Sequence, residues 1–216
     1  LIIKLPLSCL KLNNELNCGK NLFSYNPNLT EPKPYTLEDN TLKLNISLFY
    51  IQIKDAQVPT LVLPDAITII KNTGVLNSKG IETEIMYTPA KGVIIQYNGG
   101  ITDALIKASG KRPVFTPDNT NAIAIQYSKN INAKMIGFIR TETRFIGNTY
   151  FDSSNEIKQR PYCINNFSMG VNKNKVSVVL WSKNIFNQKY ISYAYDFGAV
   201  HLGDPATYGI SISSKF

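Results

Sequence analysis

The segment TLKLNISLFYIQIKD, residues 41–55, places a hydrophobic side chain at every second position of its first ten residues. One face carries Leu42, Leu44, Ile46, Leu48 and Tyr50, and the other carries Lys43, Asn45 and Ser47. A repeat of two residues is that of a β-strand with one apolar and one polar surface. A tilted strand needs about 9 to 11 residues to cross a bilayer, and this segment is that long.

The same alternation recurs along the chain. It is found in GVIIQYNGGI (92–101), NAIAIQYSK (121–129), the segment 132–145 and the terminal TYGISISSKF (207–216). We expect about eight such strands in all. No stretch approaches the roughly 18 to 20 apolar residues of a membrane-spanning helix. The sequence therefore predicts an all-β, antiparallel fold.

Short and long connections alternate between these strands. Polar turns are expected at 88–92, 128–134 and 172–175, and long links rich in Asn, Asp, Pro, Gly and Tyr at 56–78, 103–119, 147–161 and 184–206. This alternation places all short turns at one end of the sheet and all long loops at the other, as in outer-membrane β-barrels. A soluble β-sandwich has the same strand periodicity and stays an alternative.

Charged residues indicate which face of a strand would meet lipid. Arg140, Glu142 and Arg144 alternate on one face of the segment 132–145. Charges are unfavourable toward lipid and are tolerated toward a water-filled interior. We therefore assign this face to the interior. The face expected toward lipid carries Met135, Gly137, Ile139 and Phe145.

Composition excludes several function classes. The 216 residues carry a formal charge of +8, but the Lys residues are scattered singly, without the basic helix face or aromatic platform of a nucleic-acid-binding protein. His201 is the single His, and no P-loop, Rossmann or HExxH motif is present. We expect neither an enzyme nor a bound cofactor or metal.

Three cysteines, Cys9, Cys18 and Cys163, do not have the spacing of a zinc or redox site. A disulfide between Cys9 and Cys18 in an oxidising compartment and three unpaired thiols are both compatible with the sequence.

The stretch VVLWSKNIFNQKYIS, residues 178–192, changes from apolar to amide-rich around the only Trp of the chain. We expect its first part to pass through hydrocarbon and Trp181 to lie at the boundary with the headgroups, where aromatic residues concentrate. The alternative is a buried core aromatic of a soluble domain.

Two motifs resemble those of TonB-dependent receptors, the ligand-gated outer-membrane transporters of Gram-negative bacteria. WSKNIFNQKY (181–190) resembles W-x-x-N-[LI]-F-[DN]-x-x-Y through Trp181, Asn184, Phe186 and Tyr190. NTGVLNSKGIETE (72–84) resembles N-x-G-x-x-x-x-[KR]-G-x-E-x-E, with Gly80, Glu82 and Glu84. Further similar segments follow in the family's order, namely SLFYIQIKDAQV (47–58), FTPDNT (115–120), GNTYFDSSNEIKQRPY (147–162) and GDPATYGISISSKF (203–216).

The resemblance implies a barrel of about 22 strands with an N-terminal plug, which takes up ferric siderophores, vitamin B12 or other scarce nutrients with energy supplied through TonB. We expect residues 41–216 to be the C-terminal part of such a barrel in the cell outer membrane. No plug or energy-coupling box is recognisable. We therefore expect a truncated or non-functional fragment without TonB coupling, and an irregular segment 1–40 with a deletion junction before Asp39.

The terminal strand resembles the signal by which the barrel-assembly machinery recognises outer-membrane proteins. Its residues are Tyr208, Ile210, Ile212 and Phe216. The expected partners are this machinery, outer-membrane lipid or lipopolysaccharide and, in intact relatives, a ferric siderophore. The candidate ligand contacts are the loop aromatics Tyr150, Tyr193, Tyr195 and Phe197, with loop packing or an aromatic girdle as the alternative.

Two other functions stay open. A small barrel closed by pairing of residues 42–53 with 208–216 would have a structural or adhesive role in the outer membrane. A soluble β-sandwich would be a binding module.

Overall fold

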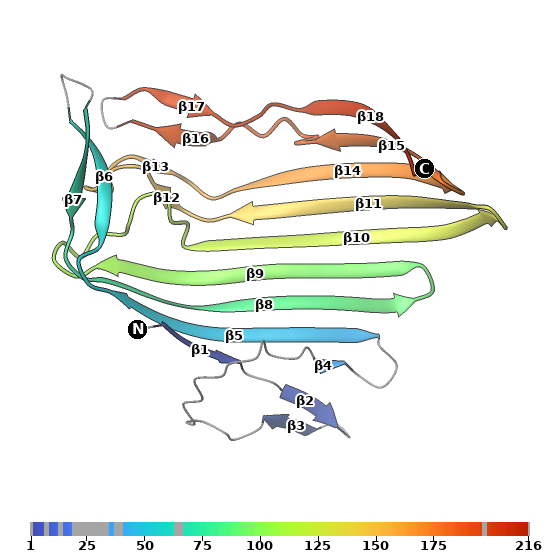
Figure 1. Ribbon diagram of the computed structural model, residues 1–216, viewed down its shortest axis with the longest axis horizontal. Helices are drawn as coiled ribbons and strands as arrows, with labels where there is room; N and C mark the ends of the chain where they lie inside the picture. The colour runs from blue at the N-terminus through green and yellow to red at the C-terminus, as the bar shows by residue number, and fades with distance from the viewer. Residues whose placement is uncertain are drawn as a thin grey trace.

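The computed structural model describes residues 2–6, 9–12, 15–18, 35–36, 41–62, 67–195 and 198–215. Every regular element in these ranges is a β-strand, and neighbouring strands of the main sheet run antiparallel (Figure 1). None of these residues belongs to a helix able to span a membrane. The predicted all-β, antiparallel fold is confirmed.

One sheet of ten strands forms most of the molecule, in the order β1-β5-β8-β9-β10-β11-β14-β15-β18, with β4 also paired to β5. Eight of these strands form what we call the wall. They are β5 (Leu42–Ile53), β8 (Leu76–Ala90), β9 (Val93–Ile106), β10 (Asn119–Asn132), β11 (Met135–Ile146), β14 (Tyr162–Lys173), β15 (Val176–Lys183) and β18 (Thr207–Ser214). Their number is the predicted one.

The two ends of the wall differ in their connections, as the sequence predicts. At the turn end, two-residue turns join β8 to β9, β10 to β11 and β14 to β15. The long connections all lie at the loop end, on the left of Figure 1. Three of them contain short hairpins, namely β6 (Gln57–Val62) with β7 (Ile67–Asn72), β12 (Thr149–Tyr150) with β13 (Lys158–Gln159), and β16 (Ile191–Ala194) with β17 (Val200–Leu202).

Strand register sorts the side chains of the wall into two faces. Residues directly opposite each other on neighbouring strands share a face. The apolar face contains the row Val93, Tyr127, Ile139, Met169, Leu180 and Ile210. This row begins at the first residue of β9 and ends in the middle of β18. Such a stagger is expected of tilted strands in a barrel wall.

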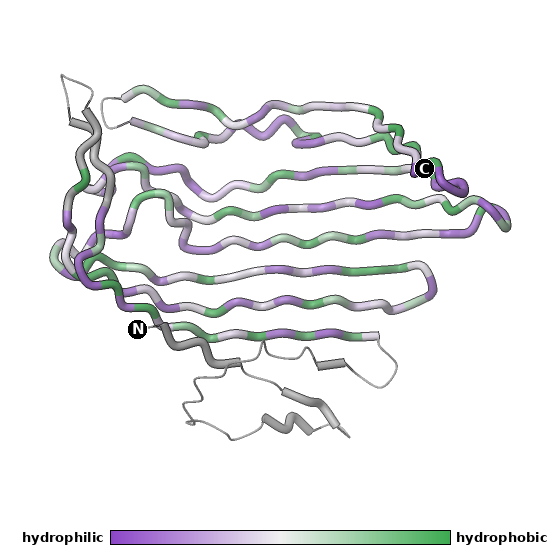
Figure 2. Tube along the Cα trace, viewed as in Figure 1, coloured by the Kyte–Doolittle hydropathy of each residue, from purple (hydrophilic) through white to green (hydrophobic). Residues whose placement is uncertain are grey.

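The polar face contains the row Gln126, Arg140, Ser168, Trp181 and Gly209. Hydrophobic and hydrophilic residues consequently alternate along the wall strands (Figure 2). On the apolar face, Ile101, Ile210 and Ile212 are 62%, 66% and 73% exposed. A continuous exposed apolar surface of this kind fits contact with lipid rather than water.

Both alternative folds are wrong. The strands that contact each other in the described ranges are hydrogen-bonded neighbours, so no second sheet packs on the wall as a β-sandwich requires. The wall is also not closed by its own strands. β5 pairs with β8 on one side and with β1 and β4 on the other, whereas β18 pairs with β15.

The described part of the N-terminal segment contains four short strands, namely β1 (Ile2–Pro6), β2 (Cys9–Leu12), β3 (Glu15–Cys18) and β4 (Tyr35–Thr36). β1 and β4 lie along the same edge of β5, opposite residues 47–51 and 43–44. The β2–β3 hairpin pairs Cys9 with Cys18 along the backbone. Their side chains lie outside the described part of the structure. The deletion junction and the domain boundary near residue 40 stay predictions.

Buried side chains gather at the loop end. They are Ala56, Ala104, Ile106, Phe151, Asp152, Ser182, Asn184 and Ala194. In the middle of the wall, Ala124 is the single buried side chain among the described residues. The core of this molecule therefore lies between the loops and the ends of the wall strands that the loops connect.

Candidate functional site

Charged side chains form a connected group on the polar face. The Arg140 Nη1 atom donates to Gln96 Oε1 at 2.9 Å, and Arg140 Nη2 lies 3.7 Å from Glu142 Oε2. Arg144 Nε lies 3.7 Å from the other oxygen of Glu142, which also accepts from Asn166 Nδ2 at 3.4 Å. The Arg144 side chain is 61% exposed. The polar face thus contains a charged and water-accessible surface, as predicted for the interior of a barrel.

A broad depression of about 700 Å³ lies beside this group, toward the loop end. Its lining includes Glu82, Glu84, Arg144, Tyr162 and Tyr190. The small residues Gly100 and Ala122 also line it. Because carboxylates, a guanidinium and phenol rings meet in one concavity, this surface can bind a polar, partly aromatic ligand by hydrogen bonds and stacking.

The two tyrosines of the depression are stacked. The rings of Tyr162 and Tyr190 lie 4.4 Å apart at an interplanar angle of 14°. Gly203 lies against the Tyr190 ring, and a Cβ atom at this glycine would overlap the ring. The Gly203 amide also donates to the Tyr190 carbonyl at 2.9 Å. These contacts fix the position of the last aromatic residue of the WSKNIFNQKY segment.

An aromatic cluster joins three long loops above the wall. Phe115 stacks on Tyr193 at 5.0 Å and is tilted against Phe151 at 5.7 Å, and Tyr193 meets Tyr195 edge-on at 4.6 Å. The Phe115 amide also donates to the Tyr150 carbonyl at 2.8 Å. Tyr193 and Tyr195, which are predicted ligand contacts, therefore take part in loop packing. Ligand contact itself stays a prediction, and Phe197 lies outside the described residues.

The loop between β11 and β14 is held by a buried carboxylate. Asp152 is 8% exposed, and its oxygens accept from the Ser154 hydroxyl, the Ile157 amide (2.7 Å) and the Glu156 amide (3.2 Å). Burial raises the pKa of Asp152, but these hydrogen bonds to the charged form outweigh it, and the net pKa lies below the ordinary 3.8. Sequence reasoning did not identify this residue.

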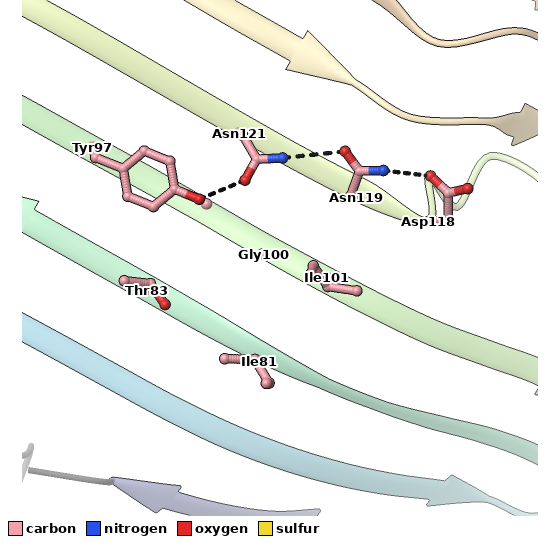
Figure 3. A pocket seen from close by; sticks show the side chains of 9 residues that line it. Ile81, Thr83, Tyr97, Gly100, Ile101, Asp118, Asn119 and Asn121 are labelled. Atoms are coloured by element: carbon pink, nitrogen blue, oxygen red, sulfur yellow. Dashed lines mark hydrogen bonds between the residues drawn. The ribbon is translucent and has the colours of Figure 1, made fainter.

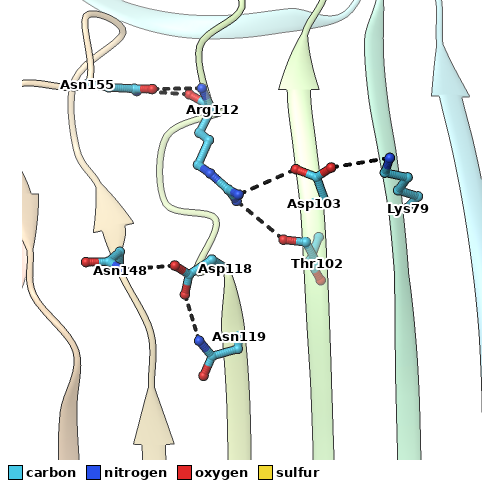
Figure 4. Close-up of polar contacts among 8 residues, drawn as sticks. All are labelled: Lys79, Thr102, Asp103, Arg112, Asp118, Asn119, Asn148 and Asn155. Carbon is cyan, nitrogen blue, oxygen red and sulfur yellow. Dashed lines mark hydrogen bonds and ion pairs between the residues drawn. The ribbon is translucent and has the colours of Figure 1, made fainter.

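The same loop is tied to the loop between β9 and β10. The Asn155 side chain accepts from the Arg112 amide at 2.7 Å and donates to the Arg112 carbonyl at 3.1 Å. The Arg112 guanidinium reaches down to Asp103 Oδ1 and to the Thr102 carbonyl, both at 3.4 Å (Figure 4). The loop end is therefore one connected structure.

Trp181 is held by contacts with the terminal strand. Its ring is on the polar face, where Nε1 donates to Ser211 Oγ at 3.0 Å. It packs against Gly209, the residue directly opposite on β18. Leu180 and Trp181 occupy opposite faces because side chains alternate along a strand. Contact of Trp181 with headgroups stays a prediction.

Asn184 organises the turn that follows β15. It is 3% exposed and has a φ of 48°. Its Nδ2 atom donates to the Gln188 and Asp204 carbonyls, each at 2.9 Å, and its Oδ1 atom accepts from the Gln188 amide at 2.8 Å. The neighbouring motif residue Phe186 is 76% exposed. The structure thus gives Asn184 a structural role, whereas most of the Phe186 side chain is open to the surroundings.

The second motif lies on β8. Gly80, Glu82 and Glu84 are all on the polar face. Glu84 Oε2 accepts from Asn45 at 3.3 Å. Gly80 lies opposite Phe49, whose ring occupies the space that a side chain at residue 80 would need. The same aromatic-over-glycine pairing occurs at Phe138 with Gly170 and at Trp181 with Gly209.

The terminal strand exposes its predicted apolar residues. Tyr208, Ile210 and Ile212 lie on the apolar face of β18, and Tyr208 is 68% exposed. Phe216 lies outside the described residues. Recognition by the assembly machinery stays a prediction.

Residue types that can bind a metal ion or act as a nucleophile are dispersed over the described ranges. These ranges contain no group of three or more His, Cys, Asp or Glu residues that could hold a metal ion. His201 Nδ1 lies 2.9 Å from Ser192 Oγ on the exposed β16–β17 hairpin. Cys163, a free thiol on β14, interacts with Asn165 Nδ2 at 3.9 Å.

Comparison with known proteins agrees with this architecture. Residues 33–185 match the family model described as TonB dependent receptor-like, beta-barrel. The ferric yersiniabactin uptake receptor FyuA of Yersinia pestis has a similar fold, with a TM-score of 0.72 and 21% identity over 85% of this chain and 28% of that protein.

Two further solved structures share the fold. The siderophore receptor PiuA of Acinetobacter baumannii gives a TM-score of 0.66 with 16% identity over 85% of this chain and 27% of its own. The ferric-catecholate import receptor Fiu of E. coli gives 0.64 with 18% identity over 85% and 26%. This chain therefore spans about a quarter of the length of the receptors that it resembles.

Proposed function

Because this chain belongs to the β-barrel family of TonB-dependent receptors, we propose that it forms part of the wall of an outer-membrane receptor that takes up ferric siderophores or similarly scarce nutrients. The chain spans 28% of the length of FyuA, so uptake is proposed for the whole protein. The contribution of this stretch is a section of wall with its loops. Its role is to bind and guide a ligand, and the proposal includes no catalysis.

One observation carries the proposal, namely the separation of two faces and two ends in a single-layer sheet. The apolar face suits hydrocarbon, and the polar face, with Arg140, Glu142 and Arg144, suits a water-filled lumen. The sorted connections give the orientation, because long loops lie outside the cell and short turns face the periplasm in such barrels.

On this orientation, a ligand from outside meets the aromatic loop cluster first and then the depression on the polar face. The cluster presents Tyr193 and Tyr195, which are 40% and 39% exposed. The depression below offers Glu82, Glu84 and Arg144. We propose these residues as the ligand-contacting surface of this part of the receptor.

The remaining partners follow from the same orientation. We propose outer-membrane lipid as the partner of the apolar face. We also propose the barrel-assembly machinery as the partner of β18, through Tyr208, Ile210, Ile212 and Phe216. Coupling to TonB requires a plug domain, and the described residues form wall and loops. This stretch alone would therefore not couple transport to energy.

The orientation is tested by labelling single cysteines in a chain whose three native cysteines are replaced by serine. The two substitutions are Ser153→Cys and Lys175→Cys. Ser153 is exposed in the loop after β12, and Lys175 is exposed in the turn between β14 and β15. In intact cells, a membrane-impermeant maleimide is expected to label residue 153 and not residue 175. After permeabilisation it is expected to label residue 175 as well. Equal labelling of both positions, or recovery of the chain outside the membrane fraction, would contradict the proposal.

A further inference from the structure

Two separate segments pair with the same edge of β5. β1 lies opposite residues 47–51, and β4 lies opposite residues 43–44 (Figure 1). Both run antiparallel to β5, so they follow one another in the same direction along this edge. Asn45 and Ile46 of β5 lie between the two paired ranges. β1 and β4 are therefore placed like the two ends of one strand with a single interruption.

The backbone of β5 presents alternate residues to its two edges. The Thr88 amide donates to the carbonyl of Thr41, just before β5, at 2.7 Å, and these two residues continue the pairing register of β5 with β8. Odd-numbered residues of β5 therefore bond to β8, and even-numbered residues face β1 and β4. It follows that Leu48 and Tyr50 form the hydrogen-bonded pairs with β1. The interruption leaves one such residue, Ile46, opposite none of the described strands.

Pro6, the last residue of β1, fits this backbone pattern. It lies opposite Ser47, an odd-numbered residue whose backbone groups face β8. The nitrogen atom of residue 6 therefore points away from β5, where no hydrogen-bond donor is required. Proline, which has no N–H group, is tolerated on an edge strand in that orientation.

β1 also continues the apolar face of the wall. Its register adds Leu5 to a row of apolar residues that crosses three strands, namely Leu48, Ile81 and Ile101. Figure 3 shows Ile81 and Ile101 side by side on β8 and β9, where they are 45% and 62% exposed. Lys4 is placed on the opposite, polar face. β1 thus has the same alternation as the wall strands that it extends.

The residues before β4 are poorly suited to take the place of β1. If they continued along β5 in the register of β4, Glu31 and Lys33 would fall on the apolar face. Charged residues are unfavourable toward lipid. β1 instead places Ile3 and Leu5 on that face. The distribution of charges therefore favours an interrupted strand over a continuous one.

From the shared direction, the backbone pattern and the matching faces, we infer that β1 and β4 are two parts of one interrupted strand, which adds a ninth member to the wall. The N-terminal segment of the chain is thus the partner of the β5 edge. β1 lies outside residues 33–185, the range that matches the family model, so its place in the wall is a property of this chain rather than of the matched range. A strand from elsewhere in the receptor, or from a second copy, would have to displace β1 before it could pair with Leu48 and Tyr50.

Cysteine crosslinking tests the pairing of β1 directly. In the full chain, the three native cysteines are replaced by serine, and Pro6→Cys is combined with Ser47→Cys. An antiparallel pair that is not hydrogen-bonded has a Cα separation of about 4.5 Å, and disulfides tolerate roughly 4.4 to 6.8 Å. After reconstitution in phosphatidylcholine vesicles and oxidation with copper phenanthroline, tryptic peptide mapping by mass spectrometry is expected to find the two cysteines linked within one chain.

A matched control replaces the same types of residue. Pro32→Cys with Ser47→Cys is the pair that would be linked if the residues before β4 continued along β5 in the register of β4. We expect no link in this control variant.

Hydrogen exchange provides a second measurement. Leu5→Pro removes the N–H group that faces Leu48, whereas Lys4→Pro removes one that points away from β5. The Leu48 and Tyr50 amides should therefore lose their protection from exchange in Leu5→Pro and keep it in Lys4→Pro. The amides of β5 that face β8 should stay protected in both variants, which shows that the wall is folded.

Several outcomes would overturn the interrupted strand. They are a link in the control variant, a link formed only between two chains, no link between residues 6 and 47, and unchanged protection of Leu48 and Tyr50 in Leu5→Pro. These results concern one edge of β5 and would leave the proposed function intact. A chain that does not float with the vesicles would contradict the proposed location instead, and hydrogen exchange in detergent micelles would still test the pairing.

Discussion

The wall and the loop end of this molecule are stabilised by different means. The wall is one layer thick, and Ala124 is the buried side chain of its described middle part. The loop end buries an aromatic ring at Phe151, a carboxylate at Asp152 and an amide at Asn184. One region therefore has almost no protein core, and the other has a small one.

The proposed outer-membrane location explains this difference, because two solvents then act on one chain. In the wall, antiparallel pairing satisfies the backbone, and on this proposal the apolar face gains stability from lipid rather than from a second protein layer. The loops lie in water, so they need their own buried contacts and hydrogen bonds to hold a fixed structure. An added charge should therefore lower stability most on the apolar face of the wall. Removal of a polar side chain should lower stability most at the loop end.

The largest effect is expected from a charge placed in the apolar face of the wall. Val178 and Ser177 are neighbours on β15 whose side chains lie on the apolar and polar faces, respectively. Val178→Arg should destabilise the inserted protein by about 2 to 4 kcal/mol, whereas Ser177→Arg should be close to neutral. Urea unfolding in vesicles measures both. Similar values for the two variants would show that this face does not contact lipid.

A smaller and local effect is expected at the loop end. Asn184→Ala removes three side-chain hydrogen bonds from a buried position and should destabilise the turn by about 2 to 3 kcal/mol. Asn184→Gly should be milder by roughly 1 kcal/mol, because glycine tolerates the positive φ. Limited proteolysis within residues 184–206 reports the change. Equal cleavage of wild type and both variants would mean that Asn184 does not hold this loop.

The aromatic-over-glycine pairs allow a test of the polar face. Gly209→Ala would push the Trp181 ring away and should destabilise the protein by about 1 to 3 kcal/mol. Trp181 is the single Trp, so its fluorescence emission should shift as the ring moves into water. Ser213→Ala, on the same strand and face, serves as the control. An unchanged spectrum in Gly209→Ala would contradict the packing described here.

The smallest effect is a dependence on pH confined to one loop. The pKa of Asp152 is lower in the folded loop than its ordinary 3.8, so the charged form is favoured by folding. Its stabilising contribution is present above that ordinary value and is lost as the pH falls through the folded pKa. Hydrogen exchange at the Glu156 and Ile157 amides, corrected for intrinsic rates, should accelerate in that range. Asp152→Asn should abolish this pH dependence, and amides of β14 should show none.

Sequence periodicity predicted the wall because each of its strands alternates by itself. The interior assignment of Arg140, Glu142 and Arg144 agrees with a polar face that continues across neighbouring strands. The sorted turns and loops followed from spacing alone. These features depend on residues close together in the chain, which a single sequence displays directly.

The contacts of Trp181 could not be predicted from the sequence. Alternation alone places it on the opposite face from Leu180. Its contacts with Gly209 and Ser211 depend on strand register, which one strand cannot reveal. The same holds for the cluster of Phe115 with Tyr193 and for the hydrogen bonds of Asn184, which join residues from separate loops.

The exposed edge of β18 has a thermodynamic consequence. Among the described residues β18 is hydrogen-bonded to β15 and to no other strand, so half of its backbone donors and acceptors point outward from the sheet. Any polypeptide segment that pairs there binds the folded wall but not the unfolded chain. By mass action, the measured stability of this wall should therefore rise with the concentration of the pairing segment, as it does for subunits of an obligate oligomer.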